Sequence, residues 1–432
     1  MQVSVESTGA LERRLTVQVP ADRIEQQIEE RLRSLSRRAK IKGFRPGKVP
    51  YKVVRQHYGD DVRQEVLSEV VRSSFSEAVA EKQLNPAGAP RIEPESAEPG
   101  QDLRYTATIE VYPEIELAGL DGIEVERPQV EISDADVDAM LERMRKQHAT
   151  WEEVQRPAAR GDRVSVDFEG AIDGEPFPGN KGENTAVELG AGSMLPEFEK
   201  ALEGAEPRQE LSFDVTFPDD YHGEEVAGKT ARFQVTVRGV SEPRLPELDE
   251  EFAKTFGVTE GGVEKLRERL RESMQREAEQ TARNRVKQQV LDGLAEANPV
   301  DVPTALVDEE IERLRKDTAA RMGVPEDRTA DLPRELFAEQ AEKRVRLGLL
   351  IGELIREQDI QVDRDRLKET VDGMVAGYEN PEEMARAYMQ NPQVLRSLEA
   401  MVLEEQVVDH LLERAKVSDK AVSFDELVNQ AE

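Results

Sequence analysis

The sequence predicts a multidomain protein of the mixed α+β class, because the spacing of its apolar residues changes along the 432-residue chain. Over residues 1–112, apolar and polar residues first alternate as in strands and then recur at helical spacing. Alternation returns over residues 150–245, where glycine and proline mark the turns, and residues 246–432 are helical almost throughout. The length suits roughly two to four domains of ordinary size.

The first domain is predicted to be a compact α+β unit. Its first two strands are indicated by apolar residues that alternate with polar ones, namely Val3, Val5, Leu15, Val17 and Val19. Helices are expected to begin at Pro20 and at Pro50, since proline is well tolerated at a helix start. A third helix follows with Val62 and Ala78 on its apolar side, and residues 105–111 alternate again and close the domain as a strand.

A stretch of unusual charge lies between the first two predicted helices. Residues 31–55 hold ten Lys or Arg and no Asp or Glu, although the whole chain has a formal net charge of −31. Residues 41–50 read IKGFRPGKVP, and their glycines and prolines predict a turn that carries one aromatic and one arginine side chain outward. A basic patch on so acidic a chain favours a polyanionic or acidic partner. The alternative is a solvated helix face without a partner.

The rest of the chain is predicted to contain a connector and a long helical region. Residues 113–149 form the connector, with one helix that starts near Ser133 and no chemical motif. From Leu266 to Leu294, an apolar or small residue recurs at every fourth position. Four residues of an α-helix advance about 400°, so this stripe drifts by about 40° per step. We therefore expect a long, arm-like helix that changes packing partners along its length.

Residues 150–245 are predicted to form a strongly bent antiparallel sheet around one short helix near residues 196–202. This region is rich in aromatic residues although the chain as a whole has only 5% of them. They either fill a small core or line a pocket. The aromatic residues are Phe168, Phe177, Phe198, Phe213, Phe217, Tyr221 and Phe233.

Several kinds of chemistry are excluded by the composition. The absence of cysteine excludes disulfides, a thiol nucleophile and a thiolate metal site, and the four histidines are scattered. No serine-hydrolase elbow, Walker loop or HExxH motif occurs, and Leu195 stands where a dinucleotide loop beginning at Gly190 would need its third glycine. The sequence therefore predicts a protein without cofactor, metal or nucleotide.

Neither a membrane span nor a secretory leader is expected from the sequence. No apolar run approaches the length of about 18 residues that a transmembrane helix needs. The first fifteen residues, MQVSVESTGALERRL, lack a basic leader followed by an apolar region. A cytoplasmic location is therefore expected.

The basic turn resembles the ribosome-docking signature GFRxGxxP of trigger factor, a family of bacterial chaperones that act at the peptide exit tunnel. In family members a basic residue often stands where this chain has Pro46, and Lys42 and Lys48 flank that position. The resemblance implies contacts with ribosomal protein and RNA. The docking residues that it implies are Gly43, Phe44, Arg45, Pro46, Gly47, Lys48 and Pro50.

The order of elements in residues 150–245 resembles the FK506-binding-protein (FKBP) class of peptidyl-prolyl isomerase domains. VDFEG precedes a turn and Phe177, ELGAGSMLPEFEKAL leads into a helix, and FPDDYHG precedes the last strand. Phe198 stands where many relatives have Trp, Thr185 where an aromatic is common, and Pro178 where many carry an Asp. The proline pocket implied by the resemblance consists of Phe168, Phe177, Met194, Leu195, Phe198, Tyr221 and Phe233.

These residue types suit prolyl isomerisation. Rotation about an amide has a barrier of about 18–20 kcal/mol, because the planar form is stabilised by resonance. A dry aromatic cup binds the prolyl ring and favours the twisted, less polar amide, and no nucleophile or proton transfer is needed. The hydroxyl of Tyr221 is expected to hydrogen-bond the substrate carbonyl.

The resemblance covers essentially the whole chain, because its three regions stand in the order found in trigger factor. These are the docking turn, the isomerase-like region and the helical C-terminal region. It implies a ribosome-binding domain (1–112), a linker along the C-terminal domain (113–149), an isomerase domain (150–245) and a helical chaperone domain with arms (246–432). It also implies ATP-independent shielding of nascent chains, help in protein export, a link to cell division, and a weak homodimer off the ribosome.

Two alternatives from other classes remain open. The chain could be a stand-alone prolyl isomerase whose flanking domains direct it to one partner, which predicts no ribosome binding. It could also be an acidic interaction scaffold whose middle domain has lost catalysis, to which Thr185 and Pro178 point.

Overall fold

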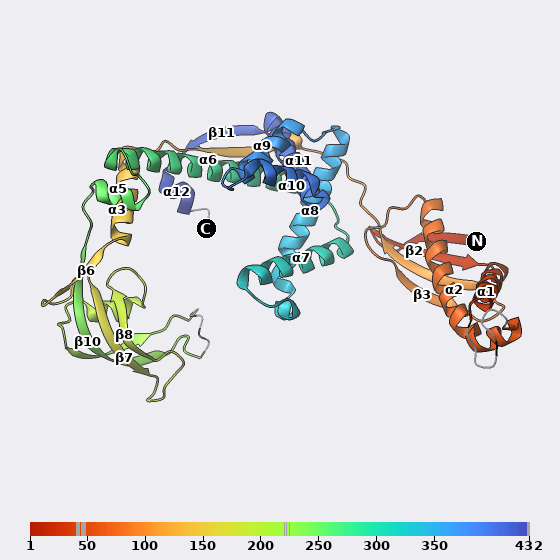
Figure 1. Ribbon diagram of the computed structural model, residues 1–432, viewed down its shortest axis with the longest axis horizontal. Coiled ribbons are helices and arrows are strands. Elements are labelled where there is room, and N and C mark those ends of the chain that lie inside the picture. Colours follow the sequence, from red (N-terminus) through yellow and green to blue (C-terminus); the bar gives the residue numbers. More distant parts are fainter. Residues whose placement is uncertain (40–43, 45–48, 220, 222, 224, 430–432) are drawn as a thin grey trace. The chain divides into compact units, whose positions relative to one another are not determined.

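The computed structural model describes residues 1–39, 44, 49–219, 221, 223 and 225–429, and it has the mixed α+β architecture that the sequence predicts. The chain divides into two compact units (Figure 1). The first unit comprises residues 1–127 and 284–420, and the second comprises 128–283 and the segment from 421 onward.

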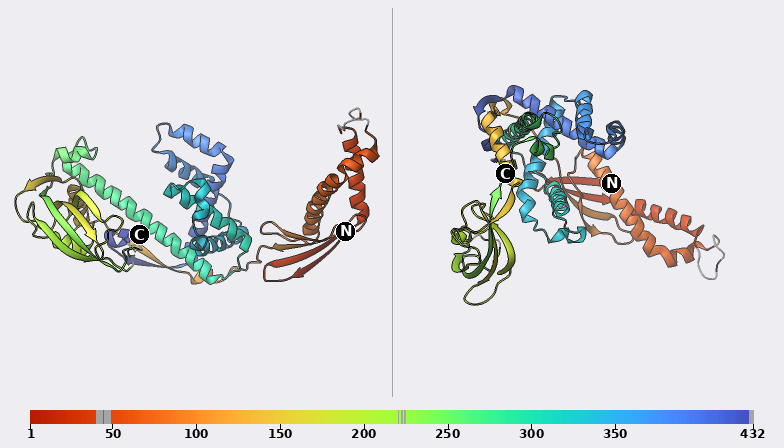
Figure 2. Two further views of the ribbon diagram at one scale, coloured as in Figure 1. Left: turned by 90° about the horizontal axis from the view of Figure 1, so that it is seen from below. Right: turned by 60° about the vertical axis from the view of Figure 1, so that its left-hand side comes forward.

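The first unit begins with a four-stranded antiparallel sheet covered by two helices. The strand order is β1-β2-β4-β3, and α1 and α2 lie side by side (Figure 2). Inward residues such as Leu15, Val17 and Tyr105 are fully buried with the apolar sides of both helices. These elements are β1 (Gln2–Ser7), β2 (Glu12–Val19), α1 (Ala21–Ser36), α2 (Tyr51–Glu81), β3 (Arg91–Ser96) and β4 (Leu103–Glu110).

Two details of this part differ from the sequence prediction. The two helices expected after Pro50 are one continuous helix, α2, because no proline interrupts it and its buried valines from Val54 to Val70 share one core. Strand β3 was not predicted, because its residues are mostly exposed and lack an apolar alternation.

The first unit also contains most of the helical region. Leu350 and Val407 are fully buried in its largest helical core, and two smaller cores join α7 to α8 and α9 to α11. The elements are 3₁₀ turn η1 (Leu120–Gly122), β5 (Glu124–Gln129), the part of α6 (Gly262–Ala297) from residue 284 onward, α7 (Thr304–Met322), η2 (Glu326–Asp331), α8 (Glu335–Glu357), α9 (Arg364–Val375), α10 (Pro381–Gln390), α11 (Pro392–Arg414) and β11 (Lys416–Ala421).

The strand β11 is an exception in a region predicted to be helical almost throughout. It pairs with β5, and the backbone N–H of Lys416 donates to the carbonyl of Ile123 at 2.8 Å. Ion pairs such as Arg127–Asp419 accompany the pairing. Every residue of β11 is exposed, so the strand carries no alternating apolar signal by which the sequence could reveal it.

The second unit contains an apolar cluster that gathers helices distant in sequence. Phe252, Phe424 and Leu427 are buried in it with one end of α6. The elements that contribute are α3 (Asp134–Gln147), α5 (Glu250–Thr255), α6 and α12 (Phe424–Asn429).

The expected change of packing partners along α6 is confirmed. Met274 and Ala278 belong to the cluster of the second unit, whereas Val290 and Leu294 belong to the core that α8 and α11 share. The apolar residues of α6 thus contribute to two different cores.

The second unit also contains a five-stranded antiparallel sheet that packs on the short helix α4. The long strand β10 pairs with β7 along one side; on the other side its first half pairs with β9 and its end pairs with β6. Phe198 and Leu202 of α4 are buried in the core of this sheet. The elements are β6 (Thr150–Val154), β7 (Arg163–Ala171), β8 (Lys181–Glu188), α4 (Pro196–Leu202), β9 (Glu210–Thr216) and β10 (Thr230–Arg244).

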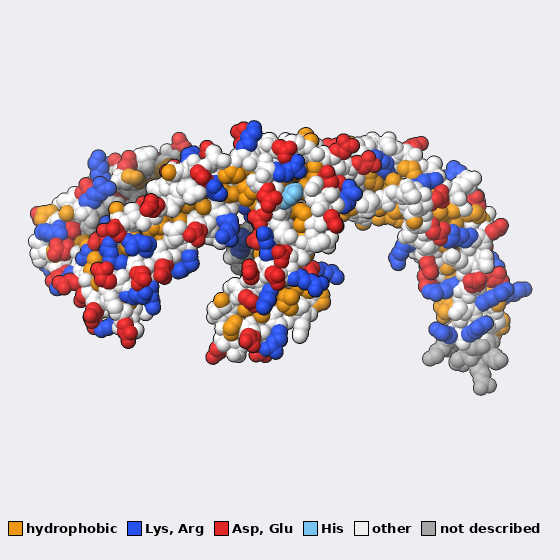
Figure 3. Space-filling model, turned by 90° about the horizontal axis from the view of Figure 1, so that it is seen from above, with side chains coloured by type: hydrophobic (Ala, Val, Ile, Leu, Met, Phe, Trp, Pro, Cys, Tyr) orange, Lys and Arg blue, Asp and Glu red, His pale blue; other side chains and the backbone are white. Residues whose placement is uncertain are grey.

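The visible surface carries acidic and basic side chains interspersed with hydrophobic ones (Figure 3). Among the helices of the described residues, none combines the length and the apolar character needed to cross a membrane.

Candidate functional site

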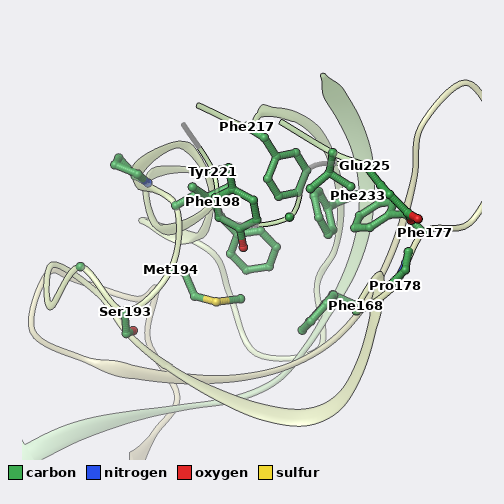
Figure 4. Close-up of a pocket in the computed structure, with 16 residues that line it drawn as sticks. Phe168, Phe177, Pro178, Ser193, Met194, Phe198, Phe217, Tyr221, Glu225 and Phe233 are labelled. Carbon is green, nitrogen blue, oxygen red and sulfur yellow. The ribbon is translucent and has the colours of Figure 1, made fainter. Parts of the chain in front are cut away.

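A cavity of about 840 Å³ lies between the curved sheet of the second unit and α4. All seven residues of the predicted proline pocket line it, so residues spread over 66 positions of sequence, from Phe168 to Phe233, meet at one place. Figure 4 shows Met194, Tyr221, Phe168 and Phe177 arranged around the open space.

Aromatic rings form the inner wall of this cavity by edge-to-face packing. Phe198 is the most buried of the seven predicted residues, with 2% of its surface exposed. Its ring centre lies 5.3 Å from that of Phe233 and 5.7 Å from that of Phe168. Such tilted pairs are favoured by the charge distribution of aromatic rings. The wall is therefore rigid and apolar, as binding of a prolyl ring requires.

Two glycines on neighbouring strands make room for two of these rings. The strand register places Phe233 opposite Gly170 and Phe168 opposite Gly182. A Cβ atom at Gly170 would lie 2.7 Å from the Phe233 ring, and one at Gly182 would lie 2.5 Å from the Phe168 ring. Any larger residue at either position would push the rings out of place.

The loop that carries Met194 and Leu195 is held by a buried carboxylate. Glu199 is 7% exposed, and it accepts hydrogen bonds from the backbone N–H groups of Gly190 at 2.9 Å and Met194 at 3.1 Å. Burial by itself opposes the charged form, but these bonds and those from Gly192 and Ser193 outweigh it and lower the pKa of Glu199. A charged carboxylate thus fixes one wall of the cavity.

The cavity also contains residues that the sequence did not assign to it. Phe217 lines it, with its ring centre 5.8 Å from that of Phe177 and 4.9 Å from that of Tyr221. Val226 and Glu225 line it as well. Phe217 had been grouped with the region's aromatics, but nothing in the sequence marked Glu225.

The two residues at which the chain departs from the usual isomerase pattern behave differently. Pro178 lines the cavity, so an apolar ring occupies the place where many relatives carry a carboxylate. Thr185 lies on β8 opposite Val166 and is absent from the described lining.

The cavity can bind a small apolar ring and exclude water from it, and Tyr221 contributes a hydroxyl that can hydrogen-bond a polar group beside that ring. In the described part of the chain, no three histidine or carboxylate side chains are grouped as a metal site would require.

The docking residues predicted from the basic turn lie mostly outside the described residues; these are Gly43, Arg45, Pro46, Gly47 and Lys48. Phe44 is described, and 41% of its surface is exposed. Pro50 directly precedes the first residue of α2 as its N-cap.

The basic residues of the α1–α2 hairpin fall into two groups. Arg31 forms an ion pair with Glu65, and Arg33 forms one with Glu29 at 2.6 Å. Closer to the docking turn, four exposed basic residues have no ion pair with any described residue, namely Arg37, Arg38, Lys52 and Arg55. Arg72, farther along α2, is exposed as well and has no ion pair with a described residue. Most of the unpaired positive charge that the structure describes on the hairpin therefore lies at the end that carries the turn.

Comparison with known families assigns most of the chain. The family described as "Bacterial trigger factor protein (TF)" matches residues 1–144, and its C-terminal counterpart matches residues 262–413. Between them, "FKBP-type peptidyl-prolyl cis-trans isomerase" matches residues 154–238.

Curated relatives match over nearly the full length. The trigger factor of Thioalkalivibrio sulfidiphilus is 52% identical over 99% of this chain and 98% of its own, and that of Alkalilimnicola ehrlichii is 51% identical over 99% and 96%. A solved trigger factor chaperone, from work on promiscuous substrate recognition in folding and assembly, covers 96% of this chain and 99% of its own at 21% identity and a TM-score of 0.48. On the evidence of its curated relatives and family matches, the chain belongs to the trigger factor family and contains an FKBP-type peptidyl-prolyl isomerase domain.

Proposed function

We propose that this chain is a ribosome-associated, ATP-independent chaperone that shields nascent polypeptides and catalyses cis/trans isomerisation of X–Pro bonds, and thereby assists folding and protein export. The observation that carries the proposal is the aromatic cavity beside α4, which all seven predicted pocket residues line. It lies within the segment matched by the FKBP-type isomerase family.

The cavity accounts for isomerisation without any reacting group. The prolyl ring of a client packs against Phe198, Phe233 and Phe168, which exclude water from the amide. The planar amide is more polar than the twisted one, so loss of water destabilises the ground state relative to the transition state. The hydroxyl of Tyr221 donates to the substrate carbonyl and holds the bond in the pocket.

Exposed apolar residues in the helical region support the chaperone part of the proposal. Eight large apolar side chains that the structure describes there are exposed, and four of them are methionines, whose flexible side chains adapt to many shapes. They are Leu248, Met322, Leu336, Met374, Tyr378, Met389, Met401 and Val417. Among charged neighbours, such residues bind unfolded segments weakly and without sequence preference.

The proposed partner of the α1–α2 hairpin is the ribosome near its exit tunnel. The exposed Phe44 and the unpaired basic residues around the docking turn support contacts with ribosomal protein and RNA. A cytoplasmic location, a weak homodimer off the ribosome and a link to cell division are further parts of the proposal. The functional domains are proposed as 1–112, 113–149, 150–245 and 246–432.

Isomerase activity is tested on a proline-containing peptide with the purified full chain. We expect acceleration of cis/trans exchange, and we expect Phe198→Ala to remove most of it. Phe256→Ala serves as the matched control, because Phe256 packs against Phe252 in the helical cluster of the second unit. An inactive wild-type chain would favour the scaffold alternative.

The chaperone and docking parts need separate assays. Co-sedimentation with bacterial ribosomes should show salt-sensitive binding that Phe44→Ala/Arg45→Ala abolishes. Suppression of aggregation of a proline-free client, without nucleotide, should survive Phe198→Ala. Isomerase activity on prolyl peptides, without ribosome binding and without suppression of aggregation, would favour the alternative of a stand-alone isomerase.

A further inference from the structure

The turn that follows Tyr221 places an acidic side chain at the edge of the isomerase cavity. Glu225 begins this turn, and the backbone N–H groups of Val226 and Ala227 both donate to the carbonyl of Gly223 at 3.0 Å. Val226 is buried in the core of the sheet and lines the cavity beside Glu225. The backbone position of Glu225 is therefore fixed by its buried neighbour, although its own side chain is exposed.

Glu225 is the charged member of an otherwise uncharged lining. Among the described residues around the cavity, every other side chain is apolar, aromatic or a neutral serine. The amine of Lys229 donates to the backbone carbonyl of Glu225 at 2.8 Å. The side-chain carboxylate of Glu225 forms no ion pair with any described residue. The charge is thus available to a bound client.

The carboxylate shares one side of the cavity with an aromatic ring. Glu225 and Phe177 line the same cavity, and in the view of Figure 4 both stand on the opposite side of it from Met194. The Phe177 ring is held by edge-to-face packing against Phe217 at 5.8 Å and Phe233 at 6.2 Å. A carboxylate next to a fixed ring suits a guanidinium group, which pairs with the former while it stacks on the latter.

We propose that Glu225 and Phe177 together select X–Pro segments that carry an arginine next to the proline. The inference rests on the proposed isomerase function and specifies its preferred clients. Pro178, which lines the cavity as well, carries no charge, so Glu225 supplies the carboxylate among the described lining residues.

A general attraction of cations by the domain has to be separated from this local effect. Residues 150–245 contain 20 Asp or Glu and 10 Lys or Arg, so the whole domain attracts basic peptides at low salt. Removal of one surface acid far from the cavity changes this background only slightly, because its charge is screened over the distance. Substitution of Glu225 must therefore change the preference for arginine peptides more than substitution of a distant acid does. Glu203 at the end of α4 is a suitable distant acid, because it is exposed and is absent from the described lining of the cavity.

The test measures kcat/KM for isomerisation of two matched peptide series. In one series the residue before proline is Arg, its neutral analogue citrulline, or Glu; in the other the residue after proline is varied in the same way. For the wild type we expect the Arg peptide of at least one series to exceed its citrulline analogue by about two- to fivefold at low salt, as for an exposed ion pair. The ratio should shrink as salt is raised.

Variants then assign the preference. Glu225→Gln should lower the Arg-to-citrulline ratio to the background that the net negative charge of the domain gives, Glu225→Asp should restore most of the difference, and Glu225→Lys should lower the ratio further. Glu203→Gln should leave the wild-type ratio unchanged. A ratio near one in the wild type, or equal ratios in wild type and Glu225→Gln, would overturn the inference while isomerase activity itself stands. Absence of activity on every peptide would overturn both proposals.

Discussion

Tyr221 combines two roles that one substitution can separate. Its ring packs against Phe217 at the wall of the cavity, while its hydroxyl is the proposed donor to the substrate carbonyl. Tyr221→Phe keeps the ring and removes the hydroxyl. A neutral hydrogen bond is worth about 0.5–1.5 kcal/mol, so we expect kcat/KM for prolyl peptides to fall roughly twofold to tenfold. Peptide isomerisation at full rate in this variant would disprove the role of the hydroxyl.

Glu199 makes the stability of the cavity wall dependent on pH. Its pKa in the folded protein is lowered below the ordinary value of 4.5, so the folded state binds this proton less readily than the unfolded state. The contribution to stability is therefore fully present at neutral pH and is lost as pH falls through the lowered pKa.

The expected result for Glu199→Gln is a fall of about 1–3 kcal/mol in the unfolding free energy of the isomerase domain at pH 7, because backbone N–H groups lose a charged acceptor. The difference from wild type should shrink as the pH falls through the lowered pKa of Glu199, where the native carboxylate is itself protonated. Urea unfolding at several pH values checks this, and a pH-independent difference would contradict it.

The seven residues that the FKBP resemblance implies line one cavity, and their part in isomerisation stays a prediction. Phe168, Phe177 and Phe198 each stand in a short pattern that the FKBP resemblance aligns. Phe217 and Glu225 were not assigned to the cavity, because Phe217 directly follows strand β9 and Glu225 lies in a turn, and no local pattern specifies that they line it.

Most of the unpaired basic residues that the structure describes on the α1–α2 hairpin lie at one end, where we propose the ribosome contact. Arg37→Gln/Arg38→Gln should weaken ribosome binding and make it less sensitive to salt, because each lost phosphate contact lowers the slope of log K against log salt by about one. Co-sedimentation over a salt series measures both the affinity for the ribosome and its dependence on salt.

The matched control for this experiment is Arg31→Gln/Arg33→Gln on the same helix. These arginines are already paired with Glu65 and Glu29, so their removal should change affinity and slope less. Equal effects of the two double variants would show that the partner does not distinguish the ends of the hairpin.

Elements with a strong apolar period were predicted correctly and those without one were not. The fourfold stripe of α6 revealed both the helix and its change of partners. The two helices predicted after Pro50 are the single helix α2, because buried residues along its length keep it continuous. Strand β11 is stabilised by its pairing with β5, which depends on residues about 290 positions away and leaves no local trace.

The whole molecule is built from separate cores, so its unfolding should not be two-state. The single tryptophan, Trp151, lies on β6 with the Arg163 guanidinium 4.6 Å from its ring centre, and it reports on the isomerase sheet. Urea titrations followed by tryptophan fluorescence and by helical circular dichroism should therefore give different midpoints.

Phe198→Ala provides the control for this prediction. Loss of a buried phenylalanine costs about 3–5 kcal/mol, which should shift the fluorescence transition strongly and the circular dichroism transition little. Coincident transitions in wild type and variant would show that the cores unfold as one.

The pairing of β6 with the end of β10 bears on how such a gene can change over time. Thr150 and Arg244 face each other across this antiparallel pair, so the chain enters and leaves the isomerase sheet at neighbouring points, about 5 Å apart. A segment with adjacent ends can be deleted, duplicated or exchanged by recombination while the path of the flanking chain stays the same. Proline-directed catalysis is therefore a heritable module that a lineage can acquire or lose in a single genetic event.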